Sequence, residues 1–379
     1  MTVWIQNPFD NLPCEGHRKQ RFWMMAKAFA AAGHSVVLWT SDFSHANKAP
    51  RTTPSHPANF DLRLVPTPPY RRNVGLARVR SHRAYARAWQ HLARMESVAP
   101  GLIVASLPTL SGAAAALSLG RVFGARVVID VQDAWPETFE RLVPRACRGL
   151  ARLALAPQRR LAQRIYREAD LVTGVCERYR ALTGRADYRS FRLGVELGPY
   201  GAVPDCRRSD AVRLVYSGNL GCTYDLKTVL RAVGSDPGLE LDIAGFGAPA
   251  GIPCGLADRV RFHGYLSAAD LQALFASCDI GVIPMADESW VGIPNKMFDY
   301  SAAGLRIVSS LGGECAALLE RYRCGVTYRP GDAGSLAAAI RAAAALDRRA
   351  ARQMCEREFD AARIYPEYVR TVLSDLEIA

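Results

Sequence analysis

The sequence predicts an α/β protein built from two doubly wound parallel sheets. Strand-like and helix-like segments alternate along the whole chain, which is typical of parallel sheets covered on both faces. The alternation starts afresh near Arg213, after a Gly- and Pro-rich stretch from Leu193 to Asp210. The 379 residues, 49% of them apolar, are enough for two domains of roughly 100 to 200 residues. We expect domains at residues 1–198 and 199–355, and a helical segment at 356–379 that packs back on the first domain.

The first half contains the clearest strands. They are Ser35–Ser41, Leu102–Ser106, Arg126–Asp133 and Asp170–Val175. A helix at about Arg18–Ala32 should end at Gly33 in a left-handed cap. The uncharged run Gly101–Gly120 is broken by Pro108, which favours a strand followed by a small-residue helix over a membrane span. The first residues, MTVWIQNPF, lack the pattern of a signal peptide, so we expect a cytoplasmic protein.

The second half follows the same order of elements. Strands are expected at Arg213–Gly221, Leu239–Gly247 and Arg261–Leu266, and Ser267 should cap the next helix. The nicotinamide-type pattern G-x-G-x-x-G is matched poorly by GFGAPAG, which lies in the middle of the domain with no clear helix after it. The last segment reads as helical, with a break at Pro366.

The segment GIPNKMFDYSAAG, Gly292–Gly304, is the most informative motif. It lies between the apolar runs DIGVIPM and LRIVSS, which predicts strand, loop, helix and strand in sequence. Such a helix begins at the carboxyl edge of a parallel sheet, where phosphates commonly bind. Its first turns carry Lys296 and Asp299.

Charge is divided unevenly along the chain. Residues 1–200 hold 29 Lys and Arg against 14 Asp and Glu, whereas residues 201–379 hold 19 against 22. A basic half could attract nucleic acid, an anionic membrane or a phosphorylated substrate. No recognisable nucleic-acid module accompanies the charge, which disfavours the first partner. The ten cysteines show no paired metal-binding spacing, and we expect no structural zinc.

Several segments together resemble a known family. SGNLGCTYDLKTVLRAV, LDIAGFG, RVRFHGYL, DIGVIP and GIPNKMFDYSAAG follow the order and spacing of the nucleotide-sugar domain of retaining glycosyltransferases of family 4. LPCEGHRKQRFWMMAKAFAAAGHSVVLWTS, VVIDVQDAWPE and ADLVTGVCERYR are similar to the acceptor domain of that family. The resemblance implies the GT-B fold, with two Rossmann-like domains facing across a cleft. It is greatest to a branch that builds bacterial cell-surface polysaccharide, including lipopolysaccharide.

The resemblance implies roles for the acidic residues of this motif. Asp299 matches the second acid of the family's Glu-x7-Glu motif, which binds the ribose hydroxyls, and a carboxylate can accept hydrogen bonds from both hydroxyls of a diol. The first acid is either displaced to Glu288 or absent. We therefore name Glu288 as a catalytic candidate towards the donor sugar.

The chain also departs from the family at the diphosphate. Many members have an Arg and a Lys in the loop where this chain has Asn219 and Thr223-Tyr224. The phosphate charge must then be met by backbone amides and by Lys296, for which the alternative is a solvated lysine. The residues expected to bind the donor are Gly16, Gly218, Asn219, Leu220, Gly245, Gly247, Tyr265, Gly292, Ile293, Asn295, Lys296 and Asp299.

The first half supplies candidates for the acceptor. Asp133 follows a buried strand and is the second catalytic candidate, with Asp130 as runner-up; either acid could instead cap a turn. Gly16 could approach the diphosphate or the acceptor, or form an ordinary turn. The residues assigned to the acceptor or to a membrane are His17, Arg18, Tyr70, Arg71, Arg72, Arg80, Arg83 and Arg87.

The arginines belong to a basic amphipathic helix at about Val74–Met95. Tyr85, Trp89, Leu92 and Met95 form its apolar side, which could simply pack on the sheet while the arginines face water. Exposed arginines could also attract an anionic bilayer. We expect peripheral association with the inner face of a membrane.

These observations predict a glycosyltransferase that moves a sugar from a nucleotide-diphosphate donor, with UDP favoured over GDP, to a glycan or lipid-linked acceptor. The resemblance implies retention of the anomeric configuration. We expect no metal and no cofactor. The alternatives are a nucleotide-sugar epimerase, an inverting transferase on the same fold, and a non-catalytic protein with a degenerate site.

Overall fold

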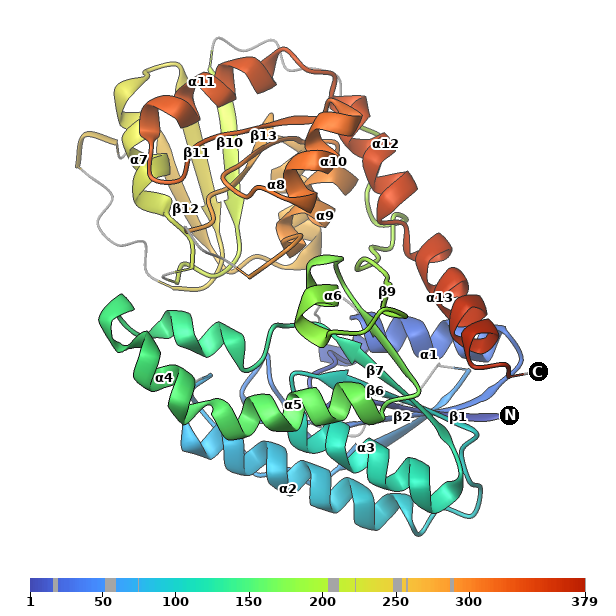
Figure 1. Ribbon diagram of the computed structural model, residues 1–379. Helices are drawn as coiled ribbons and strands as arrows, with labels where there is room; N and C mark the ends of the chain where they lie inside the picture. Colours follow the sequence, from blue (N-terminus) through green and yellow to red (C-terminus); the bar gives the residue numbers. More distant parts are fainter. Residues whose placement is uncertain are drawn as a thin grey trace. The chain divides into compact units, whose positions relative to one another are not determined.

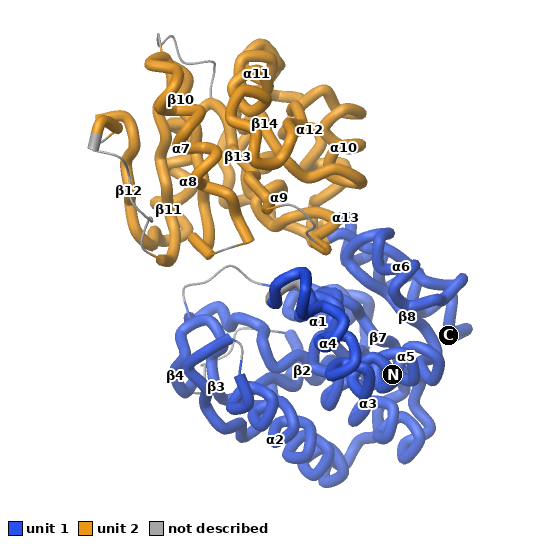
Figure 2. Tube along the Cα trace, turned by 60° about the vertical axis from the view of Figure 1, so that its left-hand side comes forward, with its two compact units in different colours: residues 1–192, 363–379 blue, residues 193–362 orange. Residues whose placement is uncertain are grey.

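Two parallel sheets organise the chain into two units. A computed structural model describes residues 1–15, 20–51, 59–73, 75–203, 211–221, 223–247, 254–256, 258–286 and 290–378 (Figure 1). Unit 1 comprises residues 1–192 and 363–379, and unit 2 comprises residues 193–362 (Figure 2). The described residues include no helix with the length and apolar character needed to cross a membrane.

Unit 1 is built on a seven-stranded sheet of order β5-β2-β1-β6-β7-β8-β9, whose paired strands are all parallel. Its strands are β1 Thr2–Gln6, β2 Ser35–Ser41, β5 Asp61–Val65, β6 Leu102–Leu107, β7 Arg126–Val131, β8 Leu171–Gly174 and β9 Arg189–Ser190. The short strands β3 Phe43–Ser44 and β4 Ala49–Pro50 form a separate antiparallel pair. Its helices are α1 Arg21–Ala31, α2 Leu76–Ala93, α3 Leu110–Phe123, α4 Arg148–Ala154, α5 Ala156–Glu168 and α6 Arg178–Thr183, with 3₁₀ turns at Pro13–Glu15, Glu137–Leu142 and Arg145–Cys147.

Unit 2 has a six-stranded parallel sheet of order β12-β11-β10-β13-β14-β15. Its strands are β10 Val212–Ser217, β11 Leu239–Ala244, β12 Val260–Gly264, β13 Ile280–Ile283, β14 Arg306–Ser309 and β15 Gly325–Thr327. Its helices are α7 Leu226–Ser235, α8 Ala268–Ala276, α9 Asn295–Ala302, α10 Glu314–Tyr322, α11 Ala333–Ala344 and α12 Arg348–Glu358, with a 3₁₀ turn at Cys254–Leu256. The sheet order reverses beside β1 in unit 1 and beside β10 in unit 2, and ligands bind at such switch points in open α/β sheets. The expected doubly wound fold is confirmed.

Local signals in the sequence placed several helix ends correctly. Gly33 follows α1 with φ +88°, a conformation that favours glycine. Ser267 caps α8 by accepting a hydrogen bond from the Asp270 amide at 3.2 Å. The break expected at Pro366 is wrong. The helices separate at residues 359–360, where Asp360 accepts a hydrogen bond from the Ala362 amide, and Pro366 lies inside α13, Ala361–Asp375.

A buried ion pair holds unit 1 together. Arg21, the first residue of α1, donates to both carboxylate oxygens of Asp130 in β7 at 2.9 Å, and both side chains are almost fully buried. Thr173 of β8 also donates to Asp130, and the Arg21 guanidinium lies 5.5 Å from the ring centre of Tyr368 in α13. One carboxylate therefore connects two strands, and through Arg21 it also fixes the first and the last helix of the unit.

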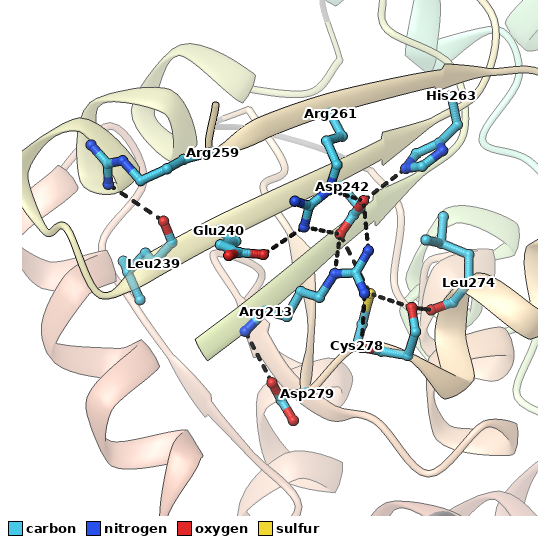
Figure 3. A network of polar contacts seen from close by, with 11 residues as sticks. Arg213, Leu239, Glu240, Asp242, Arg259, Arg261, His263, Leu274, Cys278 and Asp279 are labelled. Atoms are coloured by element: carbon cyan, nitrogen blue, oxygen red, sulfur yellow. Dashed lines mark hydrogen bonds and ion pairs between the residues drawn. The ribbon is translucent and has the colours of Figure 1, made fainter. Parts of the chain in front are cut away.

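Unit 2 contains a comparable network across β10, β11 and β12 (Figure 3). The fully buried Asp242 of β11 accepts hydrogen bonds from Arg213 at 2.7 Å, Arg261 at 3.1 Å and His263 at 2.7 Å. Burial raises the pKa of Asp242, but these donors outweigh it and hold the pKa at about 2. The network joins β10, β11 and β12, so the edge of the sheet is fixed by charge as well as by backbone pairing.

Replacing Arg21 should test the buried pair. Arg21→Met leaves a buried carboxylate without its cation, which typically costs about 3–5 kcal/mol and should lower the melting temperature of unit 1 by roughly 10 °C. Arg121→Met is the matched control, because Arg121 pairs with Glu168 at an exposed position. Differential scanning calorimetry measures both. Equal shifts in the two variants would contradict the structural role assigned to Arg21.

Candidate functional site

Helix α9 and the loop before it form the centre of the candidate site in unit 2. β13 ends at Ile283, α9 begins at Asn295 and β14 follows at Arg306, so the expected order of strand, loop, helix and strand is confirmed. Gly292 and Ile293 are buried, and Asn295 is exposed at the start of the helix. Tyr300 fixes the helix from inside, since its hydroxyl accepts a hydrogen bond from the Ser217 amide at the end of β10. The helix N-terminus therefore lies at the carboxyl edge of the sheet.

Lys296 is a buried lysine rather than a solvated one. Its side chain is enclosed and its ammonium lies 3.7 Å from the ring centre of Tyr224 and 4.8 Å from that of Tyr216. Burial lowers the pKa of Lys296 to about 7, although Asp299 acts in the opposite direction. A buried ammonium that lies against aromatic rings is strongly stabilised in its charged form by an anion placed beside it. The position is therefore suited to a phosphate.

Asp299 lies one turn further along α9, three residues after Lys296, and such residues share one face of a helix. It is partly exposed, and its Oδ1 accepts a hydrogen bond from the Tyr200 hydroxyl at 3.0 Å. This contact orients the carboxylate. Sequence reasoning did not identify Tyr200, because nothing in the stretch around it marks it as a partner of residue 299.

Two glycine loops form the neighbouring part of the edge. Gly218 follows β10 with φ +128°, and a Cβ there would lie 2.7 Å from the Lys296 ammonium nitrogen. Gly245 follows β11 with φ +147°, and a Cβ there would overlap the Gly218 carbonyl oxygen. The amides of Gly218 and Leu220 donate to the carbonyls of Ala244 and Phe246. These two amides are therefore already bonded and do not face a phosphate. Other groups at this edge would contact a phosphate, and Lys296 is the basic side chain among them.

An exposed aromatic pair lies beyond the second glycine loop. Phe246 and Tyr265 are 58% and 51% exposed, and their rings stack with centres 4.4 Å apart. Gly247, between them in the chain, has φ +114°, and a Cβ there would press on Leu220. A flat exposed aromatic surface beside a phosphate-type loop can hold a planar group. The sequence indicated Tyr265 but gave no reason to choose Phe246.

In unit 1, Asp133 and Asp130 have different environments. Asp130 is fully buried in the ion pair with Arg21, which accounts for its position without a ligand. Asp133 is partly exposed, and its Oδ1 accepts hydrogen bonds from the Ala134 amide at 2.9 Å and from Thr138 at 3.4 Å. Burial raises the pKa of Asp133 in spite of these bonds. Asp133 therefore caps the turn after β7, as the alternative interpretation expected.

Other predicted residues are spread over the surface or lie outside the described residues. Arg71, Arg72, Arg80, Arg83 and Arg87 are exposed. Tyr85 and Trp89 on the opposite side of α2 are fully buried, whereas Met95 lies beyond the helix end and is 71% exposed. The predicted site residues Gly16, His17, Arg18 and Glu288 lie outside the described residues.

A cluster that the sequence did not reveal surrounds Tyr70. The Tyr70 hydroxyl lies 2.5 Å from His45 Nδ1, and the ammonium of Lys48 lies 4.8 Å from the Tyr70 ring centre. Arg78 donates to His82 Nε2 at 3.2 Å and lies 5.0 Å from the ring centre of Trp135. These residues come from the segment after β2, from α2 and from the loop after β7. Only the tertiary structure brings these residues together. The hint in the sequence is that His45 and Lys48 follow shortly after the end of β2.

Fold and site together define a class. Each unit is a doubly wound sheet, and unit 2 presents glycine loops, a buried lysine and an oriented carboxylate at its carboxyl edge, which is the arrangement of a nucleotide-binding α/β protein. Among the described residues no group of three or more His, Cys, Asp or Glu side chains is arranged to hold a metal ion.

Comparison with protein families gives the family. Residues 212–345 match the model for glycosyl transferases group 1, and residues 19–193 match the model for the glycosyl transferase 4-like domain. The chain belongs to the group 1 glycosyltransferases of the family 4 type. It is also 30% identical over 193 residues to a glycogen synthase of Mycobacterium tuberculosis, which covers 47% of this chain and 46% of the relative. The chain thus spans about half the length of the curated relatives it matches.

Solved structures agree on the fold. Sucrose-phosphate synthase from Thermosynechococcus elongatus aligns over all of both chains with a TM-score of 0.74 and 16% identity. The Anabaena protein HepE, in complex with UDP-glucose, aligns over 99% of this chain and 100% of its own with a TM-score of 0.68 and 16% identity. WaaG, a glycosyltransferase involved in lipopolysaccharide biosynthesis, aligns over 99% and 100% with a TM-score of 0.63 and 15% identity. The GT-B fold is confirmed.

The environment of Lys296 predicts an unusual titration. We expect the Cε signal of Lys296, in protein labelled with ¹³C-lysine, to titrate with a midpoint near pH 7, because burial disfavours the charged form. Lys296→Arg identifies the signal by removing it. Saturating inorganic pyrophosphate should raise the midpoint, since an anion beside the ammonium favours protonation. A midpoint unchanged by pyrophosphate would place the anion elsewhere.

Proposed function

We propose that this protein transfers a sugar from a nucleotide-diphosphate sugar, preferably a UDP-sugar, bound by unit 2. The observation that carries the proposal is the placement of Lys296 and Asp299 on one face of α9, beside the glycine loop at Gly218. An edge of this kind offers one cation for a diphosphate and one carboxylate for a diol. The likeness to a protein solved with UDP-glucose supports a nucleotide sugar as the donor.

Each part of the site then has a role. Lys296, with the helix N-terminus at Gly292, Ile293 and Asn295, would stabilise the charge that grows on the diphosphate as the sugar leaves. Asp299 would accept hydrogen bonds from the ribose hydroxyls, with Tyr200 holding its orientation. The stacked pair Phe246 and Tyr265 would lie against the base.

Unit 1 would bind the acceptor. We assign it a glycan or lipid-linked acceptor in the synthesis of bacterial cell-surface polysaccharide, and the likeness to an enzyme of lipopolysaccharide biosynthesis supports this assignment. Asp133 from unit 1 and Glu288 from unit 2 remain the catalytic candidates, and Gly16, His17, Arg18, Tyr70, Arg71 and Arg72 remain candidates for substrate contact. Retention of configuration is part of the proposal.

We also propose that unit 1 binds an anionic membrane surface at the inner face. Arg80, Arg83 and Arg87 are exposed along α2. Leu150 and Leu153 of α4 are 73% and 74% exposed. They lie close together on one helix, unlike the single scattered apolar residues that are common on protein surfaces. Basic side chains draw a protein to anionic lipid, and exposed leucines can insert between the headgroups.

Donor binding is tested by calorimetric titration with UDP, GDP and their sugars. We expect a UDP-sugar to bind, and Asp299→Ala to weaken it at least tenfold because two charge-assisted hydrogen bonds are lost. The melting temperature should change little, since Asp299 is partly exposed. Asp258→Ala, at an exposed position in the same unit, is the matched control.

The outcomes separate the alternatives. Equal affinity in Asp299→Ala would remove this residue from the site, and a protein that binds none of the nucleotides would not be a transferase of this kind. Product analysis without any acceptor distinguishes an epimerase, which would release an altered nucleotide sugar. The configuration of the product distinguishes a retaining from an inverting enzyme.

Membrane binding is tested by sedimentation with phosphatidylglycerol vesicles. Replacing Arg80, Arg83 and Arg87 together by Gln should weaken binding at least tenfold, at about 1 kcal/mol for each basic residue near the surface. The control replaces Arg321, Arg329 and Arg341, three exposed arginines of unit 2. If both triple variants sediment like the parent protein, α2 only packs on the sheet.

A further inference from the structure

Unit 1 contains a pocket beside the start of α2. Its volume is about 410 Å³, and it lies between the start of α2, the loop after β6, the loop after β7 and the junction of α4 and α5. Most of its wall is apolar. The wall includes Leu76, Val79, Leu110, Phe139, Leu155 and Leu161. Leu76 and Val79 are 77% and 42% exposed, so they lie at the mouth of the pocket.

One part of the wall is cationic. Arg78, His82 and Trp135 line the pocket and also belong to the cluster around Tyr70. Arg78 donates to the Asn73 carbonyl at 2.7 Å and lies within 5.3 Å of the Phe9 ring centre. Backbone and ring contacts thus fix the guanidinium in place at the pocket wall, on the side where the strands of the sheet end.

The charge of this cluster is poorly balanced. Lys48 donates to Asn73 Oδ1 at 2.7 Å, and neither Lys48 nor Arg78 forms an ion pair with any acid in the part of the chain that the structure describes. Burial, together with nearby cations, lowers the pKa of His45 and of His82 to about 3, so both rings are neutral near pH 7. Asp133 is the acid that acts on Arg78 from the loop after β7. Two cations beside one acid favour an anionic guest.

We propose that the pocket and this cluster form one site for an amphiphilic phosphate ester. Its hydrocarbon chain fills the pocket, and its phosphate lies against Lys48 and Arg78. The inference rests on the proposed function and deepens it: the acceptor carries its sugar on a phosphate-linked aliphatic chain, and unit 1 recognises the linkage itself. Free inorganic phosphate shares only the charge of this ligand.

The dimensions and the lining fit such a ligand. Pockets for small molecules typically occupy about 300–1,000 Å³ and are mainly apolar with a few placed polar groups. An apolar chain gains from burial of each methylene, whereas a sugar alone would leave its hydroxyls against leucine and phenylalanine without partners. The exposed leucines of α4, Leu150 and Leu153, belong to the helix next to the pocket, which suits a chain drawn from a bilayer.

The probes are hexyl, octyl and decyl phosphate, each below its critical micelle concentration, and the measurement is calorimetric titration of the full chain. We expect the affinity to rise about fourfold for each added methylene until the pocket is full. Decanol, which lacks the charge, and inorganic phosphate, which lacks the chain, should each bind at least tenfold more weakly than decyl phosphate. An affinity independent of chain length would overturn the proposal.

Two matched pairs of variants locate the ligand. Val79→Trp narrows the mouth and should weaken decyl phosphate at least tenfold, whereas Val122→Trp, at an exposed position of α3, should not. Lys48→Gln should weaken decyl phosphate about tenfold without affecting decanol, whereas Lys227→Gln in unit 2 should change neither. Parent-like binding in both Val79→Trp and Lys48→Gln would exclude this pocket.

Titration with a UDP-sugar on the same preparations keeps the two proposals distinguishable. Nucleotide binding without any binding of alkyl phosphates leaves the proposed function in place and overturns the pocket assignment. Binding of alkyl phosphates that shows the expected response to Val79→Trp supports the site even in a protein that binds no nucleotide, and in that case the transferase proposal is the one that fails.

Discussion

The candidate site of unit 2 depends on the close packing of two glycines, Gly245 and Gly218, and the side chain of Lys296. Gly245 packs against the Gly218 carbonyl, and Gly218 in turn packs against the Lys296 ammonium, so that neither position has room for a Cβ. This contact places a cation from α9 beside the loop after β10 and keeps it between two tyrosine rings. Because the lysine is buried, its charged form is weakly solvated, and an anion placed beside it would stabilise that form.

The doubly wound topology explains why the important groups gather at a few loops. In a parallel sheet all strands end at the same edge, and the reversal of strand order opens a crevice beside the central strand. In unit 2 this brings together the loops after β10, β11 and β13. In unit 1 it brings together the segments after β2 and β7 with the start of α2, and so assembles the cluster around Tyr70 and the apolar pocket next to it.

Burial distinguishes the two acids near the end of β7 in unit 1. Asp130 and Asp133 are two strand-end acids with similar surroundings in the sequence, yet Asp130 is fully enclosed with Arg21 and connects two strands with two helices. Asp133 instead caps a turn, and its charge acts on Arg78. Exposed and buried arginines differ in the same way: Arg80, Arg83 and Arg87 of α2 face water, whereas Arg21 contributes to the stability of the unit.

The sequence by itself determined the two doubly wound sheets, the loop and helix at Gly292–Gly304, and the presence of Lys296 and Asp299 in the first turns of α9, because these follow from local periodicity, caps and short spacing. Tertiary structure decided which acid is structural, that Tyr200 orients Asp299, and that Phe246 stacks on Tyr265. It also decided that Lys48 and Arg78 meet beside an apolar pocket. These contacts join residues from separate strands and helices, and the distance between such residues is set by sheet order and packing, which no short stretch of sequence encodes.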